Sequence, residues 1–590
     1  MPGGGPLQVR WLGTKIAYDD AYALQRGIHF GSPDNYLLLL EHASVFTLGA
    51  RGDRANILCD PDEVGAQVRK VDRGGDVTWH GPGQLVGYPV LSIAGKRGGG
   101  MADTVAYVGS VEQLIIDVLA DLGLPGAGRL SDYPGVWIDP ESDNPRKIAA
   151  IGVKLSRGRT MHGFALNVMP DPVWFERMVP CGISDKAVTT LALEGVDASM
   201  STVVDAVTSR AGQLWGAGVP IERADVAWKH RVTDLSAFSR GEGPGEVPRV
   251  TPQAAPDTPA VPAGSADTAA VRAGTADAPA VPAGTEQPVR LLGRLAQVGV
   301  TGGLDITERK PEWMRVKADM GPEYRRLKGV MRELDLVTVC EEAGCPNIFD
   351  CWNDGTATFM INGERCTRAC GFCLVDTRRP EALDADEPHR VAEAVAKMAL
   401  SYAVITTVAR DDLDDGGAGA MADTIDAVRE RNPDCKVEVL ISDCKGDPES
   451  LATIFTARPD VLNHNIESVA RLQRAVRPSA GYARSLGVLA RAKEAGLVTK
   501  SSIIVGMGET TAEVVQTLGD LNAIGVDIVT IGQYLRPTTN HLPIARWWTP
   551  DEFADLKRIG EAMGISHVES SPLTRSSYHA KAGEAAATSS

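Results

Sequence analysis

The segment Cys366-Thr-Arg-Ala-Cys370-Gly-Phe-Cys373 brings three thiols together within eight residues, at C-x3-C-x2-C spacing. One short loop can direct all three toward a single inorganic centre. A cubic iron–sulfur cluster has four irons, and each takes one outside ligand, usually a thiolate. Three ligands leave one iron open, and an open coordination position favours chemistry over storage. The segment therefore predicts a reactive iron–sulfur centre.

A second trio of cysteines lies just upstream. Cys340, Cys345 and Cys351 follow C-x4-C-x5-C spacing, so six of the ten cysteines fall within 34 residues. A structural zinc site is the main alternative, but zinc usually takes four closed ligands from C-x2-C pairs or from Cys with His. Two odd trios without a nearby His favour iron–sulfur chemistry. In a long chain without a signal-like start, clustered cysteines indicate metal binding or catalysis rather than disulfides.

Size and composition limit the remaining possibilities. A chain of 590 residues with 43% hydrophobic residues is expected to form at least two domains. Sixty Lys and Arg against 76 Asp and Glu give a formal charge of −16, which argues against binding nucleic acid or an anionic membrane surface. The start Met-Pro-Gly-Gly-Gly lacks a basic and apolar leader, and no apolar run approaches ~20 residues. We therefore expect a cytoplasmic protein.

The middle of the chain is of low complexity. A ten-residue repeat runs through TPAVPAGSAD (258–267), TAAVRAGTAD (268–277) and APAVPAGTEQ (278–287). It offers little bulk to bury, so 239–289 is predicted to be a disordered tether spanning on the order of 40 Å. The tether would separate an N-terminal domain (1–238) from a C-terminal domain (290–590). It would also raise the local concentration of the second active site around the first.

The N-terminal half is predicted to be a mixed α/β domain in which strands and helices do not alternate regularly. Strand-like apolar runs occur at 36–40 and 44–48, and helical periodicity covers 105–122. Segments 147–154 and 160–168 are predicted to pair as strands around the turn Arg157-Gly158-Arg159.

Three motifs of this half carry chemistry. RGGDVTWHGPGQ (73–84) is a Gly-rich loop that lets backbone approach a ligand, although such a loop with one His is often only a loop. Lys154 ends an apolar strand in KIAAIGVKL, and Cys181 lies in PCGI. Considered alone, each of these motifs can be explained by an ordinary structural role. Together they suggest a nucleophile and its activating partner, because Lys can accept a thiol proton or stabilise the thiolate.

These motifs resemble the octanoyltransferases of lipoate biosynthesis, which are relatives of the biotin and lipoate protein ligases, with Trp79 where Tyr is usual. The resemblance spans about 10–235 and implies that Cys181 carries the octanoyl group as a thioester, with Lys154 as general acid/base. It also implies an acyl pocket, in which His162 could equally be an ordinary strand residue. The residues implied for this pocket are Arg73, Gly74, Gly75, His80, His162 and Gly163.

The C-terminal half alternates strands with helices. Predicted strands at 357–361, 402–408, 436–442, 461–465, 499–505 and 527–532 are separated by helices near 388–400, 419–430, 448–457, 467–475, 482–495 and 511–523, with a last helix near 551–563. This rhythm predicts a parallel sheet, closed or partly closed into a barrel, with its site at the C-terminal ends of the strands. The thiol loop follows the first strand and so belongs at that end.

The C-x3-C-x2-C loop, with Phe372 before its last cysteine, resembles that of radical S-adenosylmethionine enzymes, which share a partial (β/α)6 barrel. The preceding stretch 338–352, TVCEEAGCPNIFDCW, and later segments such as VRPSAGYARSL and PLTRSSYHA resemble the lipoyl synthases, over about 308–582. The resemblance implies S-adenosylmethionine and two [4Fe–4S] clusters. Its Arg-Ser-Ser-Tyr motif implies Ser577 as the fourth ligand of the auxiliary cluster, with Ser576 as the alternative.

Other residues are assigned by their positions near strand ends. Five polar side chains are expected to contact S-adenosylmethionine: Thr406, Asn465, Glu467, Lys500 and Arg536. Cys435 and Cys444 lie outside both trios, and we expect them to take no part in cluster binding.

The combined interpretation is one chain with two successive enzymes, an octanoyltransferase and a sulfur-inserting lipoyl synthase. The resemblance implies several partners: octanoyl-acyl carrier protein, the lipoyl domains of 2-oxoacid dehydrogenases, the glycine cleavage H protein, an electron donor such as ferredoxin or flavodoxin, and a cluster-repair protein. Two alternatives stay open. The N-terminal half could be an ATP-dependent lipoate ligase, or the C-terminal half a non-catalytic iron–sulfur electron carrier or scaffold.

Overall fold

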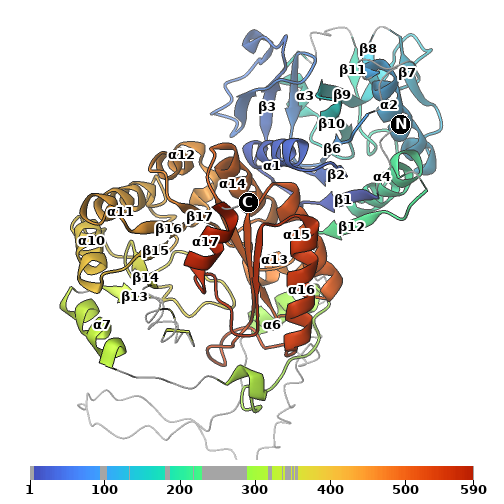
Figure 1. The fold of residues 1–590 in the computed structure, drawn as a ribbon. Helices are drawn as coiled ribbons and strands as arrows, with labels where there is room; N and C mark the ends of the chain where they lie inside the picture. The colour runs from blue at the N-terminus through green and yellow to red at the C-terminus, as the bar shows by residue number, and fades with distance from the viewer. Residues whose placement is uncertain are drawn as a thin grey trace, which may run out of the picture.

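The computed structural model describes residues 6–93, 103–131, 133–179, 186–216, 218–228, 289–315, 322–334, 336–338, 347–348, 351 and 356–588. Cys181, Cys340 and Cys345 lie outside the described residues, as does the predicted tether except for its last residue. The two halves form separate lobes that pack against each other (Figure 1).

The N-terminal lobe is built on a mixed sheet of nine strands. Eight of them run in the order β12-β1-β2-β6-β10-β9-β8-β7, and β11 pairs with β9. The strands are β1 (Leu7–Trp11), β2 (Asn35–Leu40), β6 (Gln84–Val90), β7 (Ala127–Leu130), β8 (Tyr133–Ile138), β9 (Arg146–Ser156), β10 (Arg159–Asn167), β11 (Ala187–Val188) and β12 (Glu222–Asp225). A three-stranded sheet adds β4 (Gln67–Lys70), β3 (Val45–Leu48) and β5 (Val77–His80).

Helices cover this sheet, and the helix predicted over 105–122 is among them. They are α1 (Tyr18–Gly31), α2 (Thr104–Asp121), α3 (Val173–Glu176) and α4 (Met200–Trp215). Helix α2 starts where the Asp103 side chain accepts a hydrogen bond from the N–H of Ala106, and its Val111, Leu114 and Val118 are fully buried. β9 and β10 pair antiparallel around Arg157 and Gly158, which both adopt positive φ. The mixed α/β prediction is confirmed.

The C-terminal lobe is a partial barrel. Its sheet runs in the order β13-β14-β15-β16-β17-β18-β19-β20, and all pairs from β14 to β20 are parallel. The strands are β13 (Val337–Thr338), β14 (Thr356–Ile361), β15 (Tyr402–Thr407), β16 (Lys436–Leu440), β17 (Val461–Asn463), β18 (Thr499–Val505), β19 (Ile528–Gln533) and β20 (His567–Ser570). The six predicted strands correspond to β14–β19, and the partial-barrel prediction is confirmed.

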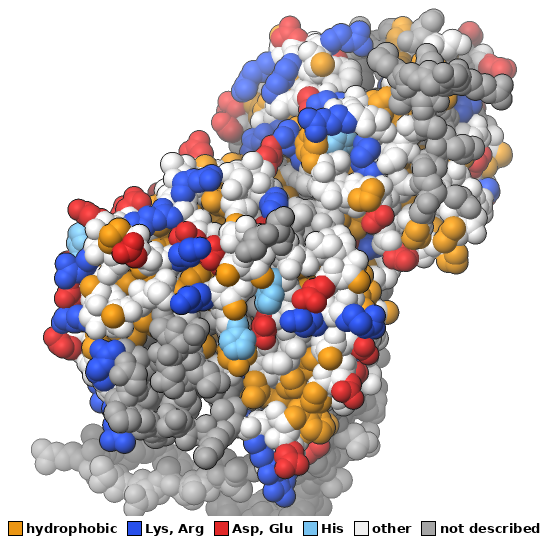
Figure 2. Space-filling model, in the orientation of Figure 1, with side chains coloured by type: hydrophobic (Ala, Val, Ile, Leu, Met, Phe, Trp, Pro, Cys, Tyr) orange, Lys and Arg blue, Asp and Glu red, His pale blue; other side chains and the backbone are white. Residues whose placement is uncertain are grey.

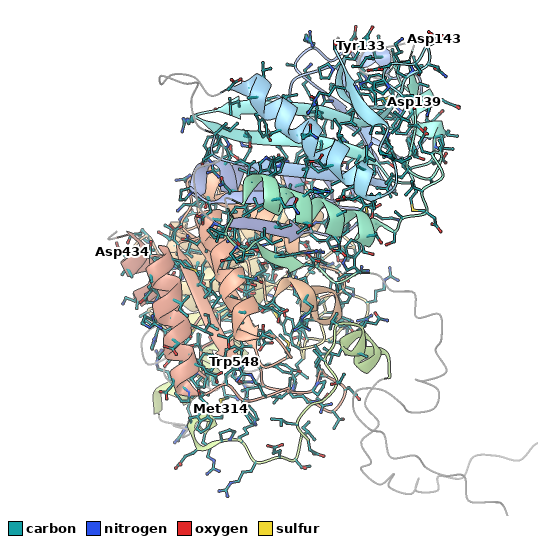
Figure 3. The ribbon with its side chains drawn as sticks, turned by 90° about the vertical axis from the view of Figure 1, so that its right-hand side faces the viewer. Tyr133, Asp139, Asp143, Met314, Asp434 and Trp548 are labelled. Carbon is teal, nitrogen blue, oxygen red and sulfur yellow. The ribbon has the colours of Figure 1, made fainter. Side chains whose placement is uncertain are left out.

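Helices surround this sheet. They are α6 (Val289–Gln297), α7 (Pro322–Glu333), α10 (Glu387–Met398), α11 (Ala418–Arg431), α12 (Pro448–Thr456), α13 (Gln473–Val476), α14 (Tyr482–Glu494), α15 (Thr511–Ala523), α16 (Pro550–Met563) and α17 (Ala580–Thr588). Capping boxes start α15 at Thr510 and α16 at Thr549. Trp548, labelled in Figure 3, is fully buried beside the start of α16.

The last helix, α17, closes one end of the barrel (Figure 1). Its Ala580 packs on Tyr402 and Val404, and its Glu584 accepts a hydrogen bond from Lys436 Nζ at 2.6 Å. Tyr402 and Lys436 are the first residues of β15 and β16. The helix therefore covers the N-terminal ends of the strands and leaves the C-terminal ends for the site.

Candidate active sites

A small cavity of about 40 Å³ lies in the N-terminal lobe, between α1, the Gly-rich loop and strands β9 and β10. All six residues expected at the acyl pocket line it: Arg73, Gly74, Gly75, His80, His162 and Gly163. The rest of the wall includes apolar Val86, Ile151 and Phe164. Glycines and apolar side chains make up most of the wall, which suits a hydrocarbon chain better than a bulky polar group.

Two glycines of this wall are required by geometry. Gly75 has φ +95°, a conformation that L side chains rarely adopt. A Cβ at Gly163 would overlap the backbone oxygen of Gly87 on the neighbouring strand β6. The close approach of β10 to β6 therefore depends on Gly163. Without a side chain there, a ligand in the cavity can approach the backbone of β10.

Arg73 and His80 are both buried in the wall. The Arg73 guanidinium donates to the carbonyl oxygens of Thr47 at 2.8 Å, Asp76 at 2.9 Å and Gly74 at 3.0 Å, which fixes the Gly-rich loop against β3. His80 Nδ1 lies 2.8 Å from Gln84 Oε1, and burial lowers the pKa of His80 to about 3. His80 is therefore neutral at ordinary pH and can act by hydrogen bonding rather than by charge.

A carboxylate that the motif analysis did not single out connects two of the expected residues. Asp72 contacts the Lys154 ammonium with one oxygen, and its other oxygen lies 2.8 Å from His162 Nε2. The hydrogen bond from His162, together with Lys154, holds the Asp72 pKa well below its usual range. Asp72 directly precedes Arg73, so its place beside the Gly-rich motif was the signal available in the sequence.

His162 has a constrained backbone. Its φ is +57°, an uncommon value for a residue with a side chain, and its N–H donates to Gln25 Oε1 at 2.9 Å. Such outliers persist where the surrounding structure fixes them, and they concentrate at functional sites. Burial lowers the His162 pKa, so its ring is neutral and Nε2 carries the proton that Asp72 accepts.

Cys181 lies in the segment 180–185, outside the described residues. The chain on either side is fixed to the lobe. The Val179 N–H donates to Asn56 O at 2.8 Å, and β11 begins at Ala187 by pairing with Arg146 at the start of β9. Strand β9 also carries Lys154.

A larger cavity, about 530 Å³, lies in the barrel half at the C-terminal ends of the strands. Its wall combines the thiol loop, through Phe372 and Cys373, with the later Ser576 and Ser577. Thr406, Asn465 and Glu467 also line it. Segments separated by two hundred residues in the sequence thus share one cavity.

The thiol loop is held by backbone hydrogen bonds. Cys366 Sγ accepts from the N–H groups of Arg368 and Ala409, both at 3.4 Å. The carbonyl of Cys373 lies 2.9 Å from His541 Nε2. Burial raises the pKa of Cys370, and it raises that of Cys373 to about 12, so without metal these thiols stay protonated.

Arg368 joins the thiol loop to two carboxylates. Its guanidinium donates to both Asp411 oxygens at 2.7 Å and to Asp443 at 2.6 Å. Arg368 and Asp443 are buried, so this ion pair is shielded from water, whereas Asp411 is partly exposed. Asp411 follows β15 and Asp443 follows β16, and the arginine therefore anchors the thiol loop to two neighbouring strand ends.

The described thiols suit a cluster better than a single ion. Within the described ranges, no three His, Cys, Asp or Glu side chains form a group that could hold one metal ion. A cubic cluster instead places its irons at separate corners, each with its own thiolate. Cys366, Cys370 and Cys373 lie on one loop and are not in disulfides, and Cys366 Sγ accepts two N–H donors, which fits that arrangement.

One described part of the second trio lies beside the Arg-Ser-Ser-Tyr motif. Asn347 Nδ2 donates to Leu573 O at 2.7 Å, and the Cys351 N–H donates to Asn347 O at 3.0 Å. Cys351 is thereby fixed close to the chain that carries Ser577. Ser576 also lines the cavity, so the geometry leaves both serines available.

The residues expected to contact S-adenosylmethionine fall into two groups. Thr406, Asn465 and Glu467 line the barrel cavity, where Asn465 Oδ1 is buried without a hydrogen-bond partner in the described structure. That oxygen can accept from a ligand amino group. Lys500 and Arg536 have other contacts. Lys500 Nζ lies 2.9 Å from Glu438 Oε1 in the barrel interior, and Arg536 donates to His541 O at 3.1 Å.

Cys435 and Cys444 are buried thiols that lie outside the thiol loop in the sequence. Cys435 is beside the start of β16, and Cys444 approaches Ser442 Oγ at 3.8 Å. Burial raises the pKa of both to about 11. They behave as small apolar side chains.

Comparison with known proteins identifies both halves. The family model for the lipoyl protein ligase A/B catalytic domain matches residues 14–211. The N-terminal domain of lipoyl synthase matches 302–345, and the radical SAM superfamily matches 360–521. The lipoyl synthase of Rubrobacter xylanophilus is 59% identical over 273 residues, which are 46% of this chain and 85% of that protein. The chain belongs to the lipoyl synthase family.

Further relatives extend the comparison. The lipoyl synthase of Nocardia farcinica is 56% identical over 273 residues, 46% of this chain and 78% of that protein. A solved lipoate protein ligase from Thermoplasma acidophilum covers 38% of this chain and 87% of its own, at 18% identity and a TM-score of 0.31. The lipoyl synthase match covers the barrel half, and the ligase A/B match covers the N-terminal half. The radical SAM lipoyl synthase family implies S-adenosylmethionine and iron–sulfur clusters as cofactors.

Among the described residues, the helices are all too short or too polar to cross a membrane.

Proposed function

We propose that this lipoyl synthase chain performs two successive steps on one carrier. The N-terminal half takes an octanoyl group from acyl carrier protein and attaches it to a lysine of a lipoyl carrier domain. The barrel half then inserts sulfur at C6 and C8 of that octanoyl chain. The product of the first step is the substrate of the second, which is a reason for both activities to be fused in one chain.

The first step needs a nucleophile and a proton carrier. The Cys181 thiolate attacks the thioester carbonyl of the octanoyl donor, and the carrier thiol leaves with a proton from Lys154. The lysine amine of the acceptor then attacks the Cys181 thioester, Lys154 takes up the amine proton, and the Cys181 thiolate is released. Neither step requires ATP, because a thioester exchanges first for a thioester and then for a more stable amide.

One observation carries this half of the proposal. The six residues expected at the acyl pocket share one small cavity with a mostly glycine and apolar wall, and His162 of that wall shares Asp72 with Lys154. Asp72 orients the Lys154 ammonium, while neutral His80 offers a hydrogen bond within the wall. An acyl chain in the cavity would thus end near the proposed acid/base.

The second step uses bound cofactors. Reductive cleavage of S-adenosylmethionine at an iron–sulfur cluster supplies the radical chemistry that opens unactivated C–H bonds. Cys366, Cys370 and Cys373 would hold this cluster, and Cys340, Cys345, Cys351 and Ser577 an auxiliary [4Fe–4S] cluster that donates sulfur. Asn465, Glu467 and Thr406 would bind S-adenosylmethionine. Apolar side chains of the wall, such as Met360, Ile504 and Leu535, would limit the access of water to the radical.

The test separates this proposal from both alternatives. Purified chain is incubated with octanoyl-acyl carrier protein and a lipoyl domain without ATP, and the acyl-thioester is trapped by mass spectrometry. We expect octanoylated lipoyl domain, with Cys181→Ser abolishing both thioester and product. Strict dependence on ATP with free octanoate would instead establish a ligase.

The second half is tested on the same material. After anaerobic cluster reconstitution, the octanoylated carrier is mixed with S-adenosylmethionine and reductant. We expect 5′-deoxyadenosine and a mass gain from two inserted sulfurs, with loss of sulfide from the protein. A chain with full iron content that forms no 5′-deoxyadenosine would be an electron carrier or scaffold.

A further inference from the structure

The two lobes meet where helix α1 lies against α14 and the end of α15 (Figure 1). The helices approach closely because the contact uses small residues. A Cβ on Gly487 of α14 would lie 3.1 Å from Asp20 O, and one on Gly27 of α1 would lie 3.0 Å from the Ala490 Cβ. A Cβ on Gly31 would lie 2.6 Å from Ala523 O. The backbones of the two lobes are therefore in near contact.

Apolar side chains close this contact. Leu24 and Ile28 of α1 belong to the same buried cluster as Leu486 and Leu489 of α14 and Ile524 after α15. Each of these side chains is at most 2% exposed. A continuous core across two lobes is typical of a permanent interface rather than of transient domain contact. Figure 2 shows the lobes joined along a continuous waist.

Charges are buried at this contact, and each finds its partner in the other lobe. Arg10 of β1 donates to both Asp520 oxygens, at 2.9 and 3.0 Å, and Tyr482 donates to the same carboxylate at 3.0 Å. Both charged side chains are only 4% exposed. Removing one member of such a pair leaves an uncompensated buried charge, which costs several kcal/mol.

A second carboxylate is matched in the same way. Asp20 of α1 accepts from Arg484 at 3.0 Å and from Arg491 at 3.1 Å, and its side chain is 3% exposed. The charges of the two ion-pair sites are arranged in opposite senses, since the N-terminal lobe supplies the cation at one site and the anion at the other. Such alternation selects one docking orientation and penalises others.

We propose that the α14–α15 face of the barrel is a docking site for the chain's own N-terminal lobe. This face, and not the segment between residues 228 and 289, holds the lobes together. The two catalytic cavities then keep a fixed relative position, because α1 contributes Tyr18 to the acyl cavity and Asp20 to the docking contact. The lipoyl carrier moves between two fixed openings, rather than one lobe reaching toward the other.

The inference is tested by cutting the connection. A specific protease site is inserted between residues 258 and 287 of the full-length chain, and the folded protein is cleaved and analysed by sedimentation. We expect the cut protein to sediment as one species with the mass of the uncut chain down to about 0.1 µM, as for a stable interface. Separation of the lobes at micromolar concentration would overturn the proposal.

A matched pair of variants tests the surface itself. The three atoms nearest to a Cβ on Gly487 all belong to Asp20 of the other lobe, so Gly487→Leu is expected to disturb docking directly. Gly519→Leu, on α15 with open space around its Cβ, is the control. After cleavage we expect the first variant to dissociate and the second to stay joined.

Gly27→Leu repeats the test from the opposite surface, since the three atoms nearest to its Cβ belong to Ala490 and Ile524 of the barrel lobe. Circular dichroism and thermal unfolding check that the separated lobes are folded. If both variants stay joined after cleavage, the contact does not hold the lobes. If the uncut wild-type chain sediments with twice the monomer mass, the N-terminal lobe docked on each barrel would belong to a second copy of the chain instead.

Discussion

Asp72 and His162 lie 2.8 Å apart between carboxylate Oδ1 and ring Nε2, and this contact leaves the second Asp72 oxygen directed at Lys154. Burial keeps His162 neutral, so its Nε2–H must donate and the carboxylate must stay charged. The histidine fixes the orientation of Asp72, and Asp72 in turn orients the ammonium. His162 and Lys154 therefore act through one shared carboxylate.

Asp72→Asn is expected to lower octanoyl transfer by about 10- to 100-fold, because a positioned proton carrier contributes at least that much. The asparagine keeps the shape but cannot pair with the ammonium. Single-turnover transfer from octanoyl-acyl carrier protein measures the loss. Sulfur insertion into a carrier that is already octanoylated is the internal control, and it should be unchanged. Equal rates for variant and wild type in the transfer assay would remove Asp72 from the acid/base arrangement.

Ser577→Ala is expected to lower the iron content of the reconstituted chain, while Ser576→Ala keeps it near that of two [4Fe–4S] clusters, about eight irons. Ser577 and Cys373 line the same cavity, and Asn347 fixes the chain near Cys351 to Leu573. A serine is a weaker cluster ligand than a thiolate, so the serine-bound iron is the first to be lost. Iron and sulfide analysis with electron paramagnetic resonance provides the measurement. The reverse ranking of the two variants would assign Ser576 instead.

Strand positions in the barrel followed from the sequence because β14–β19 are rich in apolar and β-branched residues and alternate with helical segments. β20 was missed because His567-Val-Glu-Ser570 has a single apolar residue, and only its pairing with β19 makes it a strand. The helix predicted near 467–475 is instead a short 3-10 turn at Ala470–Leu472 followed by α13. Glu467 adopts φ +66°, which a continuous helix does not allow.

The site was less predictable than the strands. The Gly-rich and thiol motifs are local in the sequence, so they could be recognised directly. In the structure, residues of each motif line one cavity. Asp72, Asp411 and Asp443 act through contacts with distant side chains, which a single sequence does not reveal. The docking of the lobes depends on pairs such as Arg10 with Asp520, 510 residues apart. No local sequence pattern indicates that either residue forms an ion pair with the other lobe.

Acid is expected to destabilise the N-terminal lobe through His42. Its Nδ1 lies 3.0 Å from Ile16 O and its Nε2 2.7 Å from Tyr88 OH, which fits a neutral ring, and burial lowers its pKa to about 4. The unfolded chain binds this proton near pH 6.5, so stability is complete above that pH and falls as pH drops toward 4. The loss reaches about 1.4 kcal/mol at pH 5.5.

Urea unfolding of wild type and His42→Gln between pH 5 and 7.5 measures this contribution. The variant should lose less stability over that range, whatever its stability at neutral pH, because the glutamine takes up no proton. Parallel slopes for the two proteins would show that His42 is not the acid-sensitive group.

Lys500→Met is expected to lower the free energy of unfolding of the barrel by about 3 to 5 kcal/mol, the usual cost of leaving a buried charge unpaired. Lys500 and Glu438 are at most 1% exposed, and the same carboxylate accepts from Tyr402 at 3.0 Å and Asn463 at 3.1 Å. The double variant Lys500→Met with Glu438→Gln should recover most of that loss, because both charges are gone. Calorimetry of the apoprotein measures both. If Lys500 instead contacts S-adenosylmethionine, the single variant would keep its stability and weaken binding of that ligand, which equilibrium dialysis would detect.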